Sequence, residues 1–161
     1  MLSHIKHAAT VNYDQALHKS AAYCSSSEHC ISELKVKLDK WEVEASDQLK
    51  IINYLKLEHY IDEVRYAVAF VKDKFRYNKW GKIKIALELK QKGINSETIA
   101  YALCTIDEEE YKQMIIKLIK DKERGIKFNN QYERQGKLLR FMTSKGFETE
   151  AVIRLISKQD I

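Results

Sequence analysis

The residue types that most often carry catalysis are scattered through this chain and form no set. Cys24, His29 and Cys30 lie close together, but no second pair of cysteines or histidines completes a four-ligand zinc site. No two histidines stand four residues apart around an acid, as metalloprotease ligands do. Gly81 and Gly93 are too far apart for a phosphate-binding loop. The sequence therefore predicts no cofactor and no metal site, and it favours buried or incidental thiols.

Two acidic runs, Asp62–Glu63 and Asp107–Glu110, could in principle hold a metal ion or exchange protons. Each run stands where a helical pattern begins, and aspartate at that position caps the first turn. Negative charge there also suits the positive end of the helix dipole. Capping explains both runs, so an enzyme is the weaker class of protein for this chain.

The positive charge of the chain is concentrated between residues 72 and 92. This segment carries eight basic and two acidic residues, a net charge of +6, whereas the whole chain has +5 and the remainder therefore sums to −1. A basic segment on a near-neutral body is typical of a protein that meets phosphates or an acidic partner surface. The alternative interpretation is a solvated helix face.

Aromatic residues interleave with this basic run. Aromatic and cationic side chains together are typical of single-strand nucleic-acid grooves and also of protein-interface hot spots. Phe70 and Phe75 have a simpler interpretation as core residues. Tyr77 and Trp80 fall in a predicted turn, where an exposed role and a structural role both remain open.

The elements that would position these residues are helices. The chain has no proline and only five glycines, which disfavours a turn-rich sandwich or barrel. Residues 83–90 alternate between apolar and polar types, as a strand would, but the segment continues to Gly93 through strong helix formers, and we predict a helix. Gly93 is expected to end that helix in the left-handed conformation. The residues predicted to cap helices are Ser27, Ser46, Asp62, Ser96 and Asp107.

The helical segments fall into groups of three. We predict an N-terminal arm at 1–13 and three-helix repeats at 14–61, 62–106 and 107–161. The segment Leu89–Ile94 resembles Met142–Phe147, and its glycine is matched by Gly146. A period near 50 residues is typical of a helical repeat array. The predicted fold class is all-α, with tandem three-helix repeats that form an elongated, curved array.

The longest uninterrupted apolar run is far shorter than the ~20 residues that a membrane-spanning helix needs. The first residues lack the continuous apolar stretch of a signal peptide. Three cysteines without a framework spacing indicate a reducing compartment. We therefore expect a cytoplasmic protein that does not interact with membranes.

The centre of the chain resembles the RecX family, whose members modulate the RecA recombinase. The segment Tyr60–Ala67 resembles the family's Gly-Tyr-Leu-Asp-Asp-x-Arg-Phe-Ala signature. Trp80-Gly81 and the helix ending in Lys92-Gly93-Ile94 resemble its aromatic-glycine turn and the helix that follows. The chain departs from the family pattern at His59, Lys79, Lys82 and Trp41, where glycine, glycine, proline and glycine are usual.

The resemblance implies a non-catalytic protein of tandem three-helix repeats that binds in the groove of the RecA–DNA filament. There it would inhibit ATP hydrolysis and strand exchange and promote filament disassembly. A monomer is expected, with weak direct DNA binding. The predicted contact residues are Arg65, Lys72, Arg76, Lys79, Trp80, Lys82 and Lys84, whereas Tyr60, Asp62, Phe70, Leu89 and Gly93 are expected to maintain the fold. The alternative is a helical-repeat module that binds single- or double-stranded DNA directly through a basic face.

Overall fold

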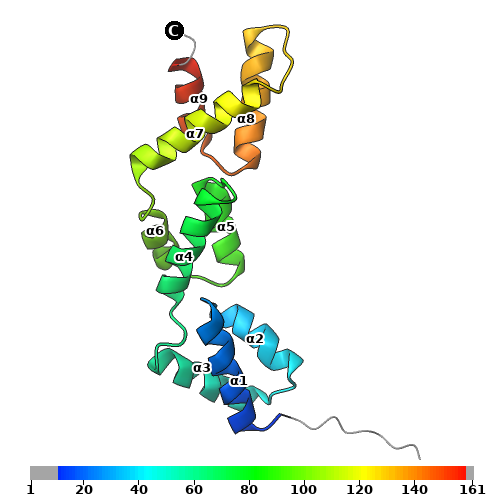
Figure 1. Ribbon diagram of the computed structural model, residues 1–161, viewed down its shortest axis with the longest axis vertical. Coiled ribbons are helices and arrows are strands. Elements are labelled where there is room, and N and C mark those ends of the chain that lie inside the picture. The colour runs from blue at the N-terminus through cyan, green and yellow to red at the C-terminus, as the bar shows by residue number, and fades with distance from the viewer. Residues whose placement is uncertain (1–10, 159–161) are drawn as a thin grey trace, which may run out of the picture. The chain divides into compact units, whose positions relative to one another are not determined.

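The computed structural model describes residues 11–158, and over this range the chain forms nine α-helices and no strand. The all-α prediction is therefore confirmed. Of the arm predicted at 1–13, residues 1–10 lie outside the described range, and Asn12 caps the first helix. The helices are α1 (Tyr13–Ser26), α2 (Ile31–Lys40), α3 (Ala45–Leu57), α4 (Glu63–Arg76), α5 (Lys82–Gln91), α6 (Ser96–Leu103), α7 (Glu108–Glu123), α8 (Gln131–Ser144) and α9 (Thr149–Lys158) (Figure 1).

The chain divides into two compact units, and α4 begins in the first and continues into the second. The first unit ends at Tyr66 and the second begins at Ala67. In the first unit α1 packs against both α2 and α3. Burial of aliphatic side chains at this contact stabilises the unit. Its core consists of Ala16, Cys24, Leu34, Leu38, Val43, Ile51, Ile52, Leu55 and Ile61.

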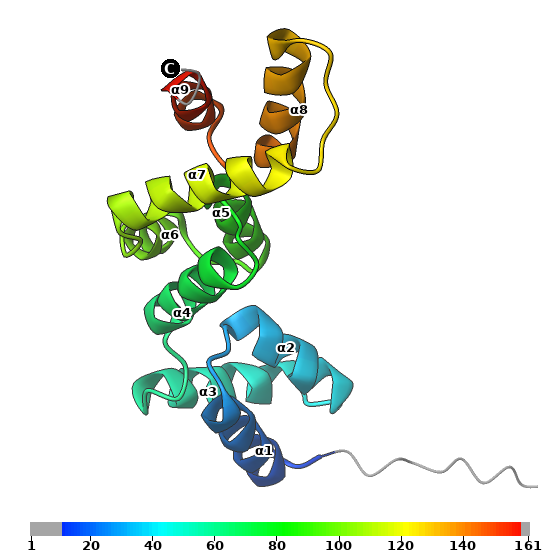
Figure 2. The ribbon, with the colours of Figure 1, turned by 45° about the horizontal axis from the view of Figure 1, so that its top comes forward.

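The second unit contains most of α4 and all of α5 to α9. In it α5 packs against α6, and α8 packs against both α7 and α9 (Figure 2). Its largest fully buried side chains are Phe75, Phe147, Ile85, Leu89, Ile115, Ile119, Leu138 and Met142. The division into repeats at 14–61, 62–106 and 107–161 stays a prediction.

Residues 82–91 form helix α5, as predicted, and the structure explains their strand-like alternation. Ile85 and Leu89 are four residues apart and fully buried, whereas Ile83 and Leu87 are more than half exposed. Two apolar rows at helical spacing therefore run along α5, one inward and one outward. In sequence these two rows read as an alternation.

Two of the five predicted caps are correct, and the three serine caps are wrong. Asp62 accepts the N–H of Arg65 at 3.0 Å, and Asp107 accepts the N–H of Glu110 at 2.9 Å. The other helices begin at different residues: Cys30 precedes α2, Glu44 precedes α3, and Asn95 caps α6. The Ser27 hydroxyl instead bonds the His29 ring, and Asn95, one residue before Ser96, accepts the N–H of Thr98 at 2.8 Å.

The two predicted glycine stops are confirmed. Gly93 and Gly146 have φ angles of 81° and 90°, a conformation that favours glycine. In each turn the residue after the glycine donates its N–H to the carbonyl five residues earlier: Ile94 to Leu89 and Phe147 to Met142, both at 3.1 Å. The second of these turns takes part in the site described next.

Candidate functional site

Trp80 lies in the turn between α4 and α5, at the centre of a group of lysines. Its N–H donates to the carbonyl of Lys74 at 3.0 Å, which closes the end of α4. Lys79, immediately before it, has a φ of 55°, in the left-handed region that favours glycine. This conformation is a physical reason to expect glycine at this position, and it means that Lys79 is held at some conformational cost.

Two lysines place their ammonium groups near the Trp80 ring. Lys74 Nζ, from the last turn of α4, lies 5.2 Å from the ring centroid, and Lys84 Nζ, from the first turn of α5, lies 4.4 Å from it. Each such cation–π contact contributes ~0.5–1 kcal/mol at a partly exposed site. The indole therefore orients two flexible lysine side chains that would otherwise sample many rotamers.

A third lysine reaches this place from the turn after α8. Gly81 donates its N–H to the carbonyl of Lys145 at 2.8 Å, and Ile83 donates to the carbonyl of Gly146 at 3.0 Å. A Cβ on Gly81 would lie 2.2 Å from the Gly146 oxygen, so only glycine permits this backbone-to-backbone contact. The contact brings Lys145 beside the start of α5.

The resulting set has concentrated and uncompensated positive charge. Burial, followed by the positive charges of Lys84 and Lys79, lowers the pKa of Lys145 below its ordinary value. Lys145 Nζ donates to the carbonyl of Asn78 at 3.4 Å. Among residues 11–158 no carboxylate forms an ion pair with the lysines of this set. We call the five half-buried residues the Trp80 cluster: Lys74, Lys79, Trp80, Lys84 and Lys145.

Four of the seven predicted contact residues do not belong to this cluster. Arg65, in the first unit, pairs with Glu28 at 2.5 Å and donates to the carbonyl of His59 at 3.1 Å. Arg76 pairs with Glu110 at 3.4 Å, and Lys82 pairs with Glu108 at 2.8 Å. Lys72 is exposed on α4. The structure thus brings Lys79, Trp80 and Lys84 together, and it engages Arg65, Arg76 and Lys82 in intramolecular ion pairs.

Sequence reasoning missed Lys145 as a member of the site. Its side chain also lies 5.8 Å from the Phe141 ring centroid, and Lys122 lies 4.7 Å from the same ring. The repeat comparison had already matched Gly146 with Gly93, but that match gives no sign of a contact with Gly81. Only the folded backbone shows that Gly81 and Gly146 touch.

The aromatic residues of the basic run have three different roles. Phe75 is buried, as predicted, and its ring centroid lies 5.7 Å from that of Tyr111. Phe70, also predicted to be core, is only half-buried, and Lys74 Nζ lies 5.3 Å from its ring centroid. Tyr77 is 81% exposed. Lysines from separate segments meet around two of these rings: Lys74 and Lys84 around Trp80, and Lys74 and Lys92 around Phe70.

The titratable groups of the first unit are arranged for structure. Burial, followed by the negative charge of Glu28, raises the pKa of the Cys24 thiol to about 11, which keeps it protonated and unreactive. His29 and Tyr66 both bond to the Glu33 carboxylate, at 2.8 and 2.9 Å. Within the described part of the chain no three histidine, cysteine or acidic residues lie close enough to hold a metal ion.

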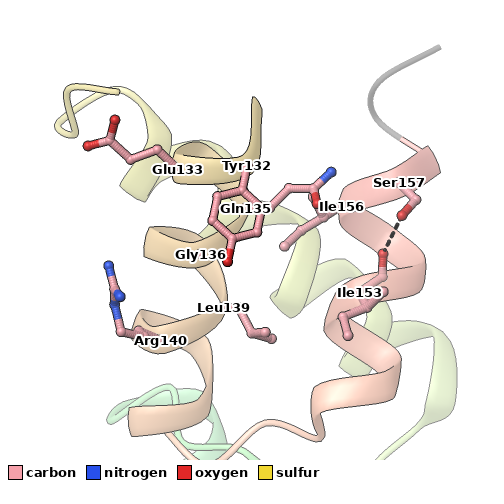
Figure 3. A pocket seen from close by; sticks show the side chains of 9 residues that line it. All are labelled: Tyr132, Glu133, Gln135, Gly136, Leu139, Arg140, Ile153, Ile156 and Ser157. Atoms are coloured by element: carbon pink, nitrogen blue, oxygen red, sulfur yellow. Dashed lines mark hydrogen bonds between the residues drawn. The ribbon is translucent and has the colours of Figure 1, made fainter. Parts of the chain in front are cut away.

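A separate open cleft of about 440 Å³ lies between α8 and α9 (Figure 3). Leu139, Ile153 and Ile156 form its apolar walls, and Tyr132 stands at its rim, 89% exposed. The Ser157 hydroxyl donates to the carbonyl of Ile153 at 3.0 Å. The lining supplies no adjacent nucleophile and base, so the cleft has no arrangement for acid–base or nucleophilic catalysis.

Comparison with known proteins places all of the Trp80 cluster except Lys145 in a segment that matches a family model. Residues 62–103 match the family model "RecX, second three-helix domain". The chain is 34% identical over 128 residues to "Regulatory protein RecX" of Clostridium beijerinckii, covering 78% of this chain and 59% of that protein. It is 30% identical over 155 residues to the protein of the same name from Clostridium botulinum strain Eklund 17B, covering 93% and 72%.

A third relative, "Regulatory protein RecX" of Leuconostoc mesenteroides, is 27% identical over 164 residues and covers 99% of this chain and 61% of its own length. The chain thus spans about 60% of the length of two of these relatives. Among solved structures, "Crystal structure of RecX from Lactobacillus salivarius" has a TM-score of 0.84 at 20% identity, covering 92% of this chain and 96% of that one. "Crystal structure of regulatory protein RecX" has a TM-score of 0.81 at 23% identity, covering 89% and 72%. At these identities the structural likeness concerns the fold.

Proposed function

Since the chain belongs to the RecX family of regulatory proteins, we propose that it binds the RecA recombinase filament, inhibits its ATPase and strand-exchange activities and promotes its disassembly. It does so by binding alone, as a monomer in the cytoplasm, without catalytic chemistry of its own. The single observation that best supports this function is that four of the five residues of the Trp80 cluster, Lys74, Lys79, Trp80 and Lys84, lie inside the segment that matches the family model.

The physical basis of the proposal is electrostatic complementarity. A filament of RecA on DNA combines phosphate charge with acidic protein surface, and a patch of uncompensated lysines is attracted to both. Lys79, Trp80 and Lys84 are the predicted contact residues that lie within the cluster. Lys72 is exposed on the preceding helix and is a further candidate contact.

The predicted contact residues that form ion pairs, Arg65, Arg76 and Lys82, contribute indirectly, by supporting the fold. Lys82 pairs with Glu108 and lies 4.6 Å from the Tyr111 ring centroid, so its charge supports the link between the first turns of α5 and α7. Arg76 and Arg65 likewise hold Glu110 and Glu28. We therefore expect reversal of these charges to disturb the fold first and filament binding second.

The decisive experiment titrates the purified protein into RecA filaments on single-stranded DNA and follows ATP hydrolysis. The wild-type protein is expected to inhibit at micromolar concentration. The double variant Lys79→Glu/Lys84→Glu should raise the half-inhibiting concentration about tenfold or more, because like charges now face the filament. Lys117→Glu, on an exposed part of α7, is the matched control and should inhibit as the wild type does. Absence of inhibition by the wild-type protein would refute the proposal.

A further inference from the structure

Gly136 is a glycine that the fold of the chain itself does not explain. Gly81 has no room for a Cβ, and Gly93 and Gly146 have positive φ angles. Gly125 follows the end of α7, an ordinary place for glycine. Gly136 instead lies inside α8, and a Cβ on it would meet no atom of residues 11–158 within 4 Å. Glycine inside a helix lowers stability relative to alanine, and its remaining use there is to admit the close approach of another backbone.

Gly136 belongs to an exposed row on α8, which we call the α8 row: Tyr132, Gly136 and Arg140. These residues are four apart, so they follow one another along one face of the helix. Tyr132 is 89% exposed, and Arg140 is exposed and forms no ion pair with any residue between 11 and 158. Tyrosine and arginine are enriched in protein interfaces and among the residues that dominate their affinity. The α8 row therefore has the composition of a contact surface.

The α8 row borders the open cleft between α8 and α9 (Figure 3). The apolar wall of this cleft consists of Leu139, Ile153 and Ile156, and Ile153 is 47% exposed. The described residues that line the cleft come from α8 and α9, and both of these helices pack on α7. A further helix that crosses α8 at Gly136 would cover the apolar wall without displacing a helix of the unit.

The charge beside the cleft indicates the kind of helix that fits. Figure 3 shows the Arg140 side chain pointing away from α9. On that side Arg140 borders a second hollow, whose lining also includes the lysines Lys122, Lys127 and Lys137. Lys137 pairs with Glu133 at 2.8 Å, whereas Lys127 is exposed and has no ion pair within the described part of the chain. A helix across Gly136 has one edge over this positive flank, where acidic side chains would be complementary.

We propose that the α8 row and the adjoining cleft are a docking site for an amphipathic α-helix of a partner protein, with leucine-like side chains on its buried face and acids along one edge. The apolar side chains fill the cleft between Leu139 and Ile153. The partner backbone passes close to Gly136, and the acids pair with Arg140 and Lys127. This arrangement is the helix-in-groove mode of recognition. The site is separate from the Trp80 cluster, so the inference goes beyond the proposed action on RecA.

The open form of the cleft favours a helix over a small molecule. Small-ligand sites enclose ~70–90% of the ligand surface and direct a few polar groups at the ligand. This cleft is open to solvent between two helices. The Ser157 hydroxyl in its lining donates to Ile153 of its own helix.

The test uses synthetic helices as probes and needs no RecA. A fluorescein-labelled peptide of about 18 residues carries leucines at spacings of three and four and glutamates along one edge. One matched peptide has lysines in place of the glutamates, and another has the same composition with the leucines distributed around the helix. Fluorescence anisotropy at about 0.1 M salt should show binding of the acidic peptide at tens of micromolar, at least tenfold weaker binding of the lysine peptide and none of the third. Equal binding of all three, or no binding of the acidic peptide, would overturn the proposal.

Substitution of Gly136 separates docking from folding. Gly136→Leu should lower the affinity for the acidic peptide at least tenfold, because its side chain takes the place of the partner backbone, while stability in urea is unchanged or higher. Gly136→Ala should stabilise the unit and weaken binding about threefold. Ala100→Leu, at an exposed position of α6, adds a leucine away from the cleft and should leave binding unchanged. A folded Gly136→Leu protein with wild-type affinity would reject the site.

A charge exchange tests the acidic edge. Arg140→Glu should weaken binding of the acidic peptide about fivefold or more and strengthen binding of the lysine peptide by a similar factor. Lys117→Glu, on an exposed part of α7, is the matched control and should alter each affinity by less than about twofold. The Lys79→Glu/Lys84→Glu variant should retain the affinity for the acidic peptide. Loss of binding in that variant, with none in Arg140→Glu, would place the peptide on the Trp80 cluster and contradict the inference.

Two measurements address other occupants of the cleft. Sedimentation equilibrium should give a monomer for the wild-type protein and for Gly136→Leu; a wild-type dimer that Gly136→Leu dissociates would assign the cleft to a second copy of the chain and reject the proposal. Removal of residues 159–161 should leave peptide affinity unchanged, whereas a tenfold gain would mean that the end of the chain itself occupies the cleft. If the acidic peptide fails to bind while inhibition of RecA persists, this inference falls and the proposed function stands. If the peptide binds and RecA is not inhibited, only the proposed function falls.

Discussion

Tyr66 in the first unit and Tyr111 in the second occupy the same place in their helices, but the earlier helices that they contact, α2 and α5, carry opposite charges near their starts. Each stands four residues after a capping aspartate, Asp62 or Asp107. Tyr66 donates its hydroxyl to Glu33 at 2.9 Å. Tyr111 donates its hydroxyl to Glu148 and also accepts the N–H of Lys82 at 3.1 Å. In both units, therefore, a tyrosine at one helix start bonds the beginning of an earlier helix.

The two units also differ in the charged residues around the earlier helix of each, α2 and α5. Glu28 and Glu33 stand two residues before and three residues after Cys30, which precedes α2. At the same offsets from Gly81, which precedes α5, stand Lys79 and Lys84. In the first unit both positions hold acids that form ion pairs within the unit. In the second unit both hold lysines that form no ion pair with any residue between 11 and 158. The common packing does not require lysines, and their presence in the second unit supports the proposed role of the Trp80 cluster.

The largest effect is expected where the backbones of α5 and the α8–α9 turn touch. Gly81→Ala would place a Cβ 2.2 Å from the Gly146 oxygen and should lower the free energy of unfolding of the second unit by about 2–4 kcal/mol. Urea unfolding followed by the fluorescence of Trp80, in a Trp41→Phe background, measures this unit. The first unit, followed through Trp41 in a Trp80→Phe background, should be unchanged.

Gly136→Ala is the matched control for that substitution. Gly136 lies inside α8, and a Cβ there would meet no atom within 4 Å. Alanine should therefore stabilise the second unit by about 0.5–1 kcal/mol through its better helix propensity. Equal effects of the two substitutions would show that the glycine contact does not hold the Trp80 cluster together.

Loss of the tyrosine hydroxyls should affect the two units unequally. Tyr111→Phe removes two hydrogen bonds, one of them to a carboxylate at 2.5 Å, and should cost about 2–3 kcal/mol. Tyr66→Phe should cost about 1 kcal/mol, because Glu33 keeps its bond to His29 at 2.8 Å. Burial raises the pKa of both hydroxyls above its ordinary value of 10.0, so they are protonated donors in the folded chain. Urea unfolding of each unit at neutral pH measures both costs, and equal costs would remove this distinction between the units.

Much of the fold could be predicted because its signals are local. The capping aspartates, the glycine stops and the helix at 82–91 each depend on a few neighbouring residues. The serine caps were wrong because several polar residues compete at each helix start. Ser27, for example, bonds His29 and leaves the start of α2 to Cys30.

The site could be predicted only in part. Lys79, Trp80 and Lys84 are near neighbours in sequence, and the charge count alone drew attention to them. Lys145 joins them through a contact between two glycines that lie in different helical groups, and composition carries no trace of such a contact. The pairing of Arg65, Arg76 and Lys82 with acids likewise depends on which helices pack together.

A smaller effect distinguishes the two arginines that were predicted as contacts. Arg65 bonds Glu28 and the carbonyl of His59, so Arg65→Lys loses the planar fork and should destabilise the first unit by about 1 kcal/mol. Arg76 forms a single exposed pair with Glu110 at 3.4 Å, and Arg76→Lys should change the second unit by less than about 0.5 kcal/mol. The urea concentration at the midpoint of unfolding of each unit measures both changes in stability. Inhibition of RecA should be unaffected by Arg65→Lys, and a clear loss would return Arg65 to the binding surface.

Replacing Lys84 of the second unit with an acid, as stands at the equivalent position of the first unit, should slightly stabilise the second unit. Lys84→Glu places an acid at the position that Glu33 occupies in α2, where it suits the helix dipole and can pair with Lys79 or Lys145. The expected gain in the free energy of unfolding is about 0.5–1 kcal/mol, together with weaker inhibition of RecA. Lys90→Glu, in the last turn of α5, is the control, because an acid there opposes the dipole and should destabilise. A destabilising Lys84→Glu would mean that the lysine supports the fold of this unit.

The smallest effect is a difference in pH dependence between the wild-type protein and Lys145→Gln. In the folded chain the pKa of Lys145 lies below its ordinary value of 10.5, because burial and the charges of Lys84 and Lys79 disfavour the ammonium form. Between the folded pKa and 10.5 the unfolded chain binds more protons, so the contribution of Lys145 to stability rises with pH. At pH 7 the variant should therefore be slightly more stable than the wild-type protein, and this gap should close as the pH approaches 10.5. Ionisation of the buried tyrosines at high pH affects both proteins alike and cancels in the difference. A gap that stays constant from pH 7 to pH 10.5 would show that the neighbouring lysines do not repel Lys145.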